Sequence, residues 1–482
     1  MRPPEPCALP RRPLRPLAAA FALAFAIHAA LPAHASSPPH TLVVGNCDDS
    51  GAGSLRDAVD HAVDDDTIDL TQLSCSTISL STGAIFVGVE GLTLHGPGHH
   101  ALMIQGFGDS GSSLIYDLGG GLLAIDGIDL SFGAKYRSDH AAHGGCVYTN
   151  GDLRVTDSHV YACTVHAATY DASGGALHAS GSVSLDRVTV EASGPTTFGT
   201  AKGGCVFAGD DLTITNSRIS GCRNAAGTQG MGGGAYAGGN LLMKYSTIDG
   251  NENDDAGSAE GGGLFVRGNS TIYWSTISNN RAHFGGGLAT GFDNVHAVFI
   301  GESTISGNEA GHAGGIGADM TTTIENSTIA FNRIPHSDSI PLDYSPSAGV
   351  GVRASTTITS TIVANNVIYG DDGDEAADIG GTQPSPVAGS NNLFMSTAQP
   401  VPPDTISDDP HLRPLADNGG STWTHAIYAD SAAIDRGIDD GYAIDQRGSG
   451  FARILGDAAD IGAFEADPDA VDTDLIFADG FD

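Results

Sequence analysis

A short pattern that recurs along the chain constrains its fold more than any other feature of the sequence. A pair of small residues is followed by an apolar or thiol residue at Cys146, Ala176, Cys205, Ala235, Leu264, Leu288, Ile316 and Val350. A second mark, usually Ser-Thr-Ile-x-x-Asn, has its apolar residue at Leu130, Val160, Val190, Ile219, Ile248, Ile277, Ile305, Ile329 and Ile362. The intervals in this second series are 30, 30, 29, 29, 29, 28, 24 and 33 residues. Self-similarity at such a period predicts a solenoid, a propeller or an array.

The repeat unit has the pattern of β-strands. Five residues before the apolar residue of the Ser-Thr-Ile mark lies another apolar column, at Ile125, Val155, Leu185, Ile214, Met243, Ile272, Ile300 and Ile324. A mostly serine column lies at Ser158, Ser217, Ser246, Ser275, Ser303, Ser327 and Ser360. Alternation at period two and Gly, Asn or Asp between short runs predict strands and turns. A coil of about thirty residues with three short strands predicts a parallel β-helix, whereas a propeller blade needs about 40–45 residues.

An asparagine column follows the apolar marks, at Asn251, Asn280, Asn308, Asn332 and Asn365. Coils of a parallel β-helix stack at a spacing of about 4.8 Å, so equivalent residues lie one above another. We therefore expect these amides to form a hydrogen-bonded ladder at a turn, and the aliphatic columns to fill the bore.

The N-terminus has the pattern of an export signal. Arg11, Arg12 and Arg15 precede an apolar run over residues 17–31, and Ala33-His34-Ala35 offers a cleavage site. The run is too short and wrongly flanked for a membrane-spanning helix. We predict that residues 1–35 are a cleaved signal peptide, that the mature chain is exported, and that it contains no transmembrane segment.

The chain is strongly acidic, with 21 Lys and Arg against 57 Asp and Glu and a formal charge of −36. This charge argues against binding to nucleic acid or to anionic membranes. It permits cation binding, although a solvated acidic exterior is the simpler interpretation.

Six cysteines follow the signal peptide. In the repeat alignment Cys146 and Cys205 share one column, and Cys163 and Cys222 share another. Partners in one column lie two coils apart, beyond the Cα separation of about 7 Å that a disulfide bridges. We therefore predict Cys146–Cys163 and Cys205–Cys222 within coils, and Cys47–Cys75 before the repeats. Free buried thiols are the alternative, and the absence of a Cys-x-x-Cys pair disfavours a metal site.

Both ends of a β-helix need a cap. Strand Thr41–Val44 and a helix over Leu55–Val63, opened by Ser54, have the pattern of the upstream cap. We divide the chain into the signal peptide (1–35), the cap and first coils (36–118), the repeats (119–369), an irregular acidic and Pro-rich connection (370–411), a C-terminal segment (412–466) and an acidic-aromatic tail (467–482).

Three segments resemble known families. Residues 48–59 are similar to the CSLREA-type cap of bacterial surface β-helices, and the Gly-Gly plus Asn repeats resemble those of polymorphic outer-membrane proteins. Residues 412–465 resemble the choice-of-anchor Q domain, through Pro414–Gly420, Thr424–Ala426, Ala433–Gly437, Asp445–Gly448 and Asp460–Glu465, with Ala432 in place of the usual proline. The tail resembles that of some exported proteins of Gram-negative bacteria. These resemblances imply a secreted or surface-displayed right-handed β-helix and no catalytic residue.

β-Helices also host polysaccharide lyases and glycosidases, so we searched for stacked carboxylates. Glu191 and Asp249 share one column with Ser220 between them, and Asp126 and Asp186 share another with Thr156 between them. Glu191 and Asp249 would suit an inverting pair of carboxylates. Isolated surface acids are the simpler interpretation of both columns, and the catalytic residues, if there are any, stay unknown.

Cation sites were considered at two places. His95, His99 and His100 could bind a metal, with a solvated loop as the simpler interpretation. The acidic run Asp371–Asp378 could hold Ca²⁺ through several oxygens, and an unstructured loop explains it as well. We assign no metal ligand and no firm cofactor.

Tyr245, Tyr273 and Trp274 lie on neighbouring coils, where exposed rings could stack on sugars and burial under a loop is the alternative.

Together these features predict an all-β protein, a right-handed parallel β-helix with a short N-terminal helical cap and a C-terminal cap segment. We expect it to be secreted or displayed on the outer surface of a Gram-negative bacterium, as an adhesin-like or polysaccharide-binding scaffold. Its partner would be an extracellular polysaccharide or a host or matrix surface. The alternatives are a pectate-lyase-like polysaccharide lyase or a glycoside hydrolase, and a structural surface-layer protein.

Overall fold

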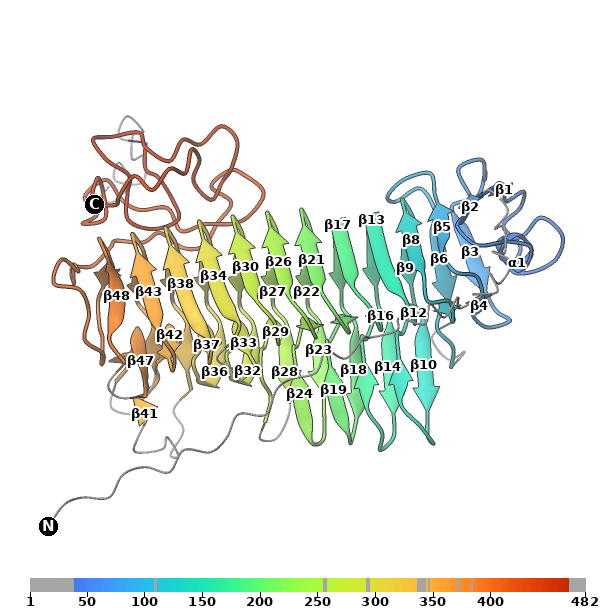
Figure 1. Cartoon of the computed structure of the whole chain (residues 1–482), viewed down its shortest axis with the longest axis horizontal. Helices are drawn as coiled ribbons and strands as arrows, with labels where there is room; N and C mark the ends of the chain where they lie inside the picture. The colour runs from blue at the N-terminus through green and yellow to red at the C-terminus, as the bar shows by residue number, and fades with distance from the viewer. Residues whose placement is uncertain are drawn as a thin grey trace, which may run out of the picture. The chain divides into compact units, whose positions relative to one another are not determined.

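The computed structural model describes residues 39–107, 111–254, 258–291, 295–335, 344–345, 347–370, 373–382 and 385–467. The predicted signal peptide and nearly all of the predicted tail lie outside these residues. Within them the chain winds as a right-handed parallel β-helix of about 11 turns. Figure 1 shows its strands stacked side by side in sheets that run along the helix. No helix among the described residues is long and apolar enough to span a membrane.

The sheet that carries the second repeat mark is here called sheet A. Most coils contribute two short strands to it, joined by a bend. Its strands are β1 (Thr41–Val43), β2 (Asp66–Asp69), β3 (Thr77–Leu80), β5 (Leu92–His95), β6 (Met103–Gly106), β8 (Leu122–Asp126), β9 (Asp129–Ser131), β13 (Asp152–Tyr161), β17 (Val183–Glu191), β21 (Leu212–Thr215), β22 (Arg218–Ser220), β26 (Leu241–Lys244), β27 (Thr247–Asp249), β30 (Ser270–Tyr273), β31 (Thr276–Ser278), β34 (Ala297–Gly301), β35 (Thr304–Ser306), β38 (Thr321–Glu325), β39 (Thr328–Ala330), β43 (Thr356–Thr359), β44 (Ile362–Ala364), β48 (Val387–Ser390) and β49 (Leu393–Phe394).

Sheet B follows the Gly-Gly pairs. It contains β4 (Ile85–Val87), β7 (Ile115–Asp117), β12 (Val147–Thr149), β16 (Leu177–Ala179), β20 (Val206–Ala208), β25 (Ala235–Ala237), β29 (Leu264–Val266), β33 (Leu288–Thr290), β37 (Ile316–Ala318), β42 (Val350–Val352), β47 (Ile379–Thr382) and the antiparallel β41 (Tyr344–Ser345).

Sheet C and a smaller sheet occupy the variable loops between sheets A and B. Sheet C contains β10 (Ala134–Arg137), β14 (Thr164–Ala167), β18 (Gly194–Thr197), β23 (Arg223–Ala225), β28 (Glu252–Asp254), β32 (Arg281–Phe284), β36 (Glu309–His312), β40 (Arg333–Ile334), β45 (Val367–Ile368) and β46 (Glu375–Ala376). The smaller sheet contains β11 (Ala142–His143), β15 (Ala172–Ser173), β19 (Thr200–Lys202) and β24 (Gln229–Met231).

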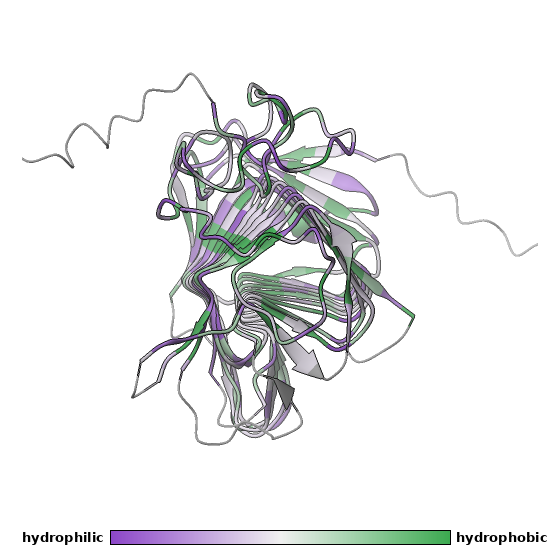
Figure 2. Ribbon diagram, turned by 90° about the vertical axis from the view of Figure 1, so that its left-hand side faces the viewer, coloured by the Kyte–Doolittle hydropathy of each residue, from purple (hydrophilic) through white to green (hydrophobic). Residues whose placement is uncertain are grey.

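The aliphatic columns fill the bore, as the sequence predicts. Ile272, Ile277 and their equivalents are buried in one continuous core of Ile, Leu and Val side chains. Viewed along the stack, the coils superimpose and apolar strands surround the interior (Figure 2). The bore is narrow, so aliphatic side chains of similar volume from successive coils can pack directly on one another.

A hydroxyl ladder makes the bend within sheet A. The hydroxyl of Ser275 accepts the backbone N–H of Ser246 and donates to the carbonyl of Tyr273, and Ser303 repeats this for Ser275. The residue before each of these serines has a positive φ, for example Tyr245 at 50° and Trp274 at 48°. The serine satisfies backbone groups that the bend removes from the strand ladder.

The predicted asparagine ladder is present. The side-chain oxygen of Asn308 accepts both the backbone N–H of Asn280 at 3.0 Å and its amide at 2.9 Å. Its own amide donates to the Ile277 carbonyl and to the side chain of Asn332. Stacking therefore satisfies each buried amide on both sides.

The last full coil lies one residue out of the predicted alignment. Sheet pairing places Val363, not Ile362, above Ile329. Thr361 takes the ladder position predicted for Ser360, and Asn366 takes the one predicted for Asn365. A one-residue shift in a strand exchanges its two faces, so Ile362 and Asn365 leave the predicted columns.

The Gly-Gly column also needs a correction. Cys146, Ala176 and Cys205 stack on one another and then on Gly234, whereas Ala235 pairs with Val206. A Cβ on Gly234 would come within 3.0 Å of the Asn251 amide, so a small residue is needed where the ladder contains asparagine.

The three predicted disulfides, Cys47–Cys75, Cys146–Cys163 and Cys205–Cys222, are all present. The N–H of Cys222 donates to Asn251, which confirms that this cysteine lies in the asparagine column. Cys205–Cys222 in one coil therefore occupies the place that Gly234 and Asn251 take in the next.

The predicted N-terminal cap is also present. It consists of β1 and α1 (Leu55–Asp60), with Ser54 accepting the N–H of Asp57 at the helix start. Leu55 and Val59 are buried against the first coils.

The C-terminal region covers the end of the bore and then one side of the stack. The stretch 370–411, expected to be irregular, includes β46 to β49, so the coils continue to Phe394. Residues 395–406 cross the last coil, with Ala398 bonded to Ile379 and Ile406 to Asn392. Residues 412–467 then lie along the outer face of sheet A, over β30 to β44 (Figure 1).

Candidate functional site

The outward-facing hydroxyls of sheet A hold the C-terminal segment in place. Thr276 donates to the Trp423 carbonyl, and Thr304 donates to the Gln446 side chain, both at 2.6 Å. Further along, Thr328 accepts the N–H of Ala463. The threonines of the Ser-Thr-Ile mark therefore form a docking surface, which explains why this polar column recurs on the outside of the sheet.

A buried ionic cluster lies beneath the same segment. Arg453 is 2% exposed and contacts Glu302 at 3.0 Å and Glu465 at 3.3 Å. Burial raises the pKa of Glu302 well above its usual value, which the Arg453 charge opposes. Removing one member of such a cluster leaves an uncompensated buried charge, so the cluster fixes the segment in one position.

An open groove lies between this segment and coils from β31 to β45. It measures about 820 Å³, within the range of small-molecule sites. One lip is a short antiparallel ribbon, in which Leu412 pairs with Ile427 and Ala416 with Thr424. The lining residues are Asn279, Ser306, Gly307, Phe331, Arg333, Asn365, Val367, Tyr369, Asp374, Leu412, Pro414, Leu415, Trp423 and His425.

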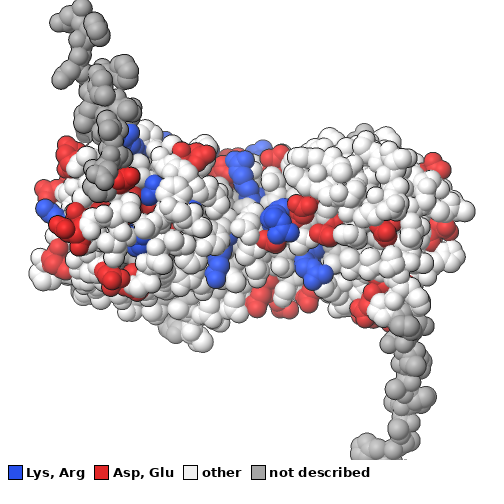
Figure 3. Space-filling model, turned by 90° about the horizontal axis from the view of Figure 1, so that it is seen from above, with Lys and Arg blue, Asp and Glu red and all other residues white. Residues whose placement is uncertain are grey.

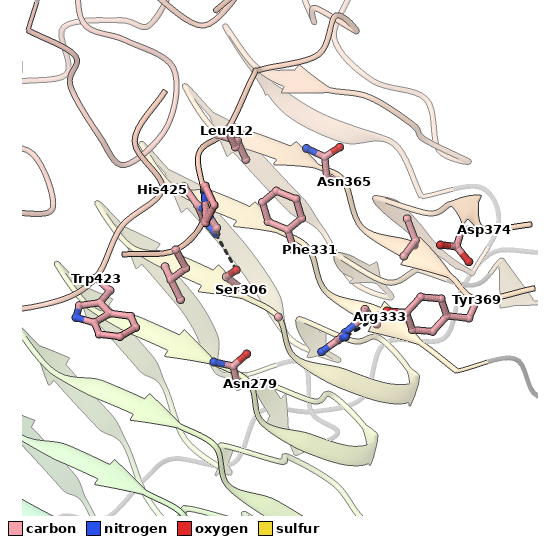
Figure 4. Close-up of a pocket in the computed structure, with 14 residues that line it drawn as sticks. Asn279, Ser306, Phe331, Arg333, Asn365, Tyr369, Asp374, Leu412, Trp423 and His425 are labelled. Atoms are coloured by element: carbon pink, nitrogen blue, oxygen red, sulfur yellow. Dashed lines mark hydrogen bonds between the residues drawn. The ribbon is translucent and has the colours of Figure 1, made fainter. Parts of the chain in front are cut away.

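Three aromatic rings are distributed along the groove. Trp423 lies at one end and Tyr369 near the other, with Phe331 between them (Figure 4). Their exposed fractions are 55%, 36% and 36%. Aromatic side chains of this exposure offer amphipathic platforms beside the polar groups of Asn279 and Asn365.

One turn column places several of these side chains. It follows the second sheet-A strand of each coil, and all its members have a φ between 48° and 68°: Phe132, Ala162, Ala192, Gly221, Gly250, Asn279, Gly307, Phe331 and Asn365. Glycine adopts this conformation at no steric cost, asparagine tolerates it, and a bulky residue is an outlier. The turn itself requires this conformation, since Phe132 adopts it in the same column at a φ of 58° far from the groove. The outward direction of the side chain places the Phe331 ring in the groove.

His425 forms the buried floor beside Phe331, whose ring centre lies 5.0 Å from its own. Its Nδ1 lies 2.7 Å from the Arg413 carbonyl, which can only accept, so Nδ1 carries the proton. Its Nε2 therefore accepts from the Ser306 hydroxyl at 2.8 Å. Burial lowers the pKa of His425 to about 4. Ser306 and His425 are both almost fully buried, so this pair fastens the segment and is not placed as an accessible nucleophile and base.

The far end of the groove is polar. Arg333 extends from β40 and donates to the Tyr369 hydroxyl at 3.2 Å (Figure 4). Asp374 is the one carboxylate among the described lining residues. A guanidinium, a phenol and two amides are thus available to hydroxyl-rich or carboxylate-bearing ligands.

The carboxylates selected from the sequence lie elsewhere. Glu191 and Asp249 flank Ser220 in register, as predicted. Glu191 pairs with His159 at 3.0 Å, and Asp249 forms a two-pronged contact with Arg218 at 2.8 and 2.9 Å. Each carboxylate is therefore engaged by its own side-chain partner, on coils outside the groove.

The second acidic column is also in the predicted register, with Thr156 between Asp126 and Asp186. Asp126 is bound by Thr156 and by His95 at 2.8 Å, beside a shallower cavity of about 420 Å³. Asp186 is bound by Thr215 and other neighbours.

Within the acidic run, Asp378 belongs to the end of the stack and not to a loop. Asp378 is buried at the end of the asparagine ladder, where it accepts the Asn366 amide at 2.7 Å and the Ser396 hydroxyl at 3.0 Å. Burial raises the pKa of Asp378, and these donors oppose the rise. Asp371 and Asp372 lie outside the described residues.

Tyr245 and Trp274 stack at 5.0 Å, and Tyr442 of the C-terminal segment packs against Trp274 at 6.4 Å. These rings therefore support the segment, while the groove uses Phe331, Tyr369 and Trp423, which the sequence did not single out. Phe331 follows the second repeat mark at the same offset as Phe132, so its position in the repeat alone could not have indicated the groove.

Comparisons with known proteins leave the function open. The scan against protein families and the search of curated proteins found no match. Among solved structures, the crystal structure of pectate lyase Pel9A matches over 89% of this chain and 97% of that chain, with 13% sequence identity and a TM-score of 0.35.

Proposed function

We propose that this protein is an extracellular β-helix scaffold that binds polysaccharide in the groove beneath its C-terminal segment. The observation that carries the proposal is the row of three partly exposed rings, with Phe331 between Trp423 and Tyr369 along one groove. Sugar rings present C–H faces that stack on aromatic rings, and their hydroxyls match amide and guanidinium groups. The groove is open, so an internal stretch of a polysaccharide chain could bind without an end being threaded through a closed site.

Binding is favoured over catalysis by the contents of the groove. A glycosidase needs two carboxylates about 5–9.5 Å apart, and a lyase needs clustered carboxylates for Ca²⁺ with a cationic base. The described lining contributes Asp374 as its one carboxylate. A polysaccharide lyase is the second candidate because Arg333 lines the groove and could act as the cationic base.

Charge suggests which glycans bind. The chain has a formal charge of −36, and Figure 3 shows acidic and basic side chains interspersed on the face that carries the segment. A densely anionic polymer would be repelled over a range of about 8 Å at physiological salt. We expect neutral or sparsely charged polysaccharides to bind better than polyuronates, and the difference to shrink in high salt.

The extracellular setting is part of the proposal. The disulfides Cys47–Cys75, Cys146–Cys163 and Cys205–Cys222 support an oxidising compartment. The predicted signal peptide, the likeness of residues 412–465 to a choice-of-anchor Q domain and the Gram-negative surface follow from the sequence. Docking of this segment on the side of the stack would then serve to complete a binding groove.

Affinity electrophoresis of residues 36–482 in gels containing neutral or acidic polysaccharides tests the proposal. Phe331→Gly and Trp423→Ala should each weaken the affinity at least tenfold, because each removes a stacking platform whose burial against a sugar is worth about 1.5–3 kcal/mol. Phe198→Ala, at a 77% exposed ring in another loop, is the matched control and should leave retardation unchanged. Retardation that survives both groove substitutions would refute the assignment, and release of unsaturated uronates would support the lyase.

A further inference from the structure

A histidine and aspartate cluster lies outside the groove, on the first coils. His99 and His100 occupy the turn between β5 and β6, and Asp129 begins β9 on the next coil. One donor atom from each of the three lies within 4.8 Å of the others. The Nδ1 atoms of His99 and His100 contact separate oxygens of Asp129, at 3.0 and 3.1 Å.

We propose that His99, His100 and Asp129 form a binding site for a divalent transition metal such as Zn²⁺. Zinc binds imidazole nitrogen and carboxylate oxygen at about 2.0–2.2 Å in tetrahedral geometry, so neighbouring ligand atoms lie about 3.4 Å apart. The two observed N–O separations are shorter than this by only a few tenths of an ångström. The two Nδ1 atoms face different oxygens of Asp129 from tilted, stacked rings. Binding one ion therefore requires the exposed imidazoles to turn until both Nδ1 atoms point at it, and the tetrahedral fourth position falls to water.

The carboxylate is fixed by the fold before any metal binds. Asp129 is 5% exposed, and its oxygens also accept the backbone N–H groups of His159 at 2.8 Å and His100 at 3.2 Å. Backbone donors of this kind hold a ligand in orientation. A buried carboxylate that is aimed at two imidazoles is a stronger feature than surface histidines that happen to lie close together.

The two histidines are held face to face. Their ring centres are 3.5 Å apart, and His100 has φ at 64°, a conformation uncommon for a residue other than glycine. The His159 ring borders both at 6.1 Å and is held by Glu191 at 3.0 Å. His99 and His100 are 37% and 69% exposed, so an ion can reach the site from solvent.

The donor set selects the class of metal. Two nitrogens and one oxygen suit zinc, nickel, copper or cobalt, whereas Ca²⁺ takes six to eight oxygens. His95 lies a few residues away but pairs with Asp126, so it is outside the cluster. The site is independent of the groove, and its loss leaves the proposed glycan binding unaffected.

Calorimetric titration of residues 36–482 with ZnCl₂ tests the proposal, with protein prepared without a histidine tag and dialysed against chelator. We expect one Zn²⁺ per chain at the site, unaffected by excess Ca²⁺. The double variant His99→Ala/His100→Ala, at exposed positions, should lose at least a hundredfold in affinity, and Asp129→Asn at least tenfold. His95→Ala is the matched control and should bind as the parent does.

Co²⁺ provides a second readout, because its visible d–d absorption intensifies in a tetrahedral site. The parent protein and the His95→Ala control should develop this band, and the double variant should not. Zinc binding of equal affinity in the parent and the double variant would overturn the proposal, as would its loss in His95→Ala.

Discussion

The alignment of the last full coil makes the sharpest stability prediction, because adjacent asparagines have different roles. Replacing Asn366 by Ala removes the acceptor of the Asn332 N–H and amide, and the donor to the Ile329 carbonyl. The Ala364 carbonyl and the Asp378 carboxylate also accept the Asn366 amide. Five buried polar groups therefore lose a partner, and each loss costs about 1–3 kcal/mol. The free energy of unfolding should therefore fall by at least about 3 kcal/mol.

Asn365→Ala is the matched control. The Asn365 side chain is partly exposed at φ 58° and belongs to the groove lining. Alanine in a left-handed conformation costs about 1 kcal/mol, with no buried group left unpaired. The two variants differ by one position in the same turn, so their comparison isolates the ladder.

Urea unfolding followed by tryptophan fluorescence measures the difference. Both tryptophans, Trp274 and Trp423, lie over the C-terminal coils or on the segment that covers them. We expect Asn366→Ala to lower the midpoint clearly more than Asn365→Ala. Equal midpoints, or a larger loss for Asn365→Ala, would refute the alignment and the energetic reasoning based on it.

Two further predictions concern stability. The double variant Cys205→Ser/Cys222→Ser should lower the free energy of unfolding by about 3 kcal/mol, because the unfolded chain loses a constraint. The double variant Cys205→Gly/Cys222→Asn should lose at least 1 kcal/mol less, because an amide at position 222 can continue the ladder to Asn251. Equal thermal midpoints for the two variants would contradict this. Burial lowers the pKa of His425 to about 4 in the folded protein, below the value of about 6.5 in the unfolded chain. The unfolded chain therefore binds the extra proton first, so the stability that neutral His425 contributes is complete above pH 6.5 and is lost as the pH falls towards 4. The destabilisation caused by His425→Gln should therefore shrink by about 1 kcal/mol per pH unit across that window, and a constant difference in urea unfolding would refute the assignment.

The repeat made the fold predictable. The residues that stack in columns recur in the sequence at a nearly constant interval, because each coil presents the same positions to its neighbours. The disulfides followed from the same alignment, since residues in one column two coils apart cannot be bridged. These inferences need only the period and the strand spacing.

The predicted alignment was wrong in the coil where residues of the expected type do not lie at the structurally equivalent positions. Ser360 matches the serine column by residue type, yet the Thr361 hydroxyl serves the ladder equally well. Asn365 and Asn366 are adjacent, so residue type alone could not choose between them. The buried pairing of Val363 with Ile329 decides the alignment, through a contact between coils that only the structure shows.

The groove could not be predicted because the contacts that form it have no period. Trp423 and His425 reach the coils through Thr276 and Ser306, more than a hundred residues earlier in the chain. The metal cluster shows the same limit: His99 and His100 are evident in the sequence, whereas Asp129 joins them only once the coils stack.

The central claim is that the groove binds glycan, and the Trp423 ring offers the most direct test. The chain contains two tryptophans, so Trp274→Phe leaves Trp423 as the sole reporter. Titration of this variant with oligosaccharides of the polysaccharide that retards it in gels should shift and saturate its emission, with an affinity that Phe331→Gly weakens at least tenfold. Retardation without any change in Trp423 emission would place binding elsewhere and contradict the account.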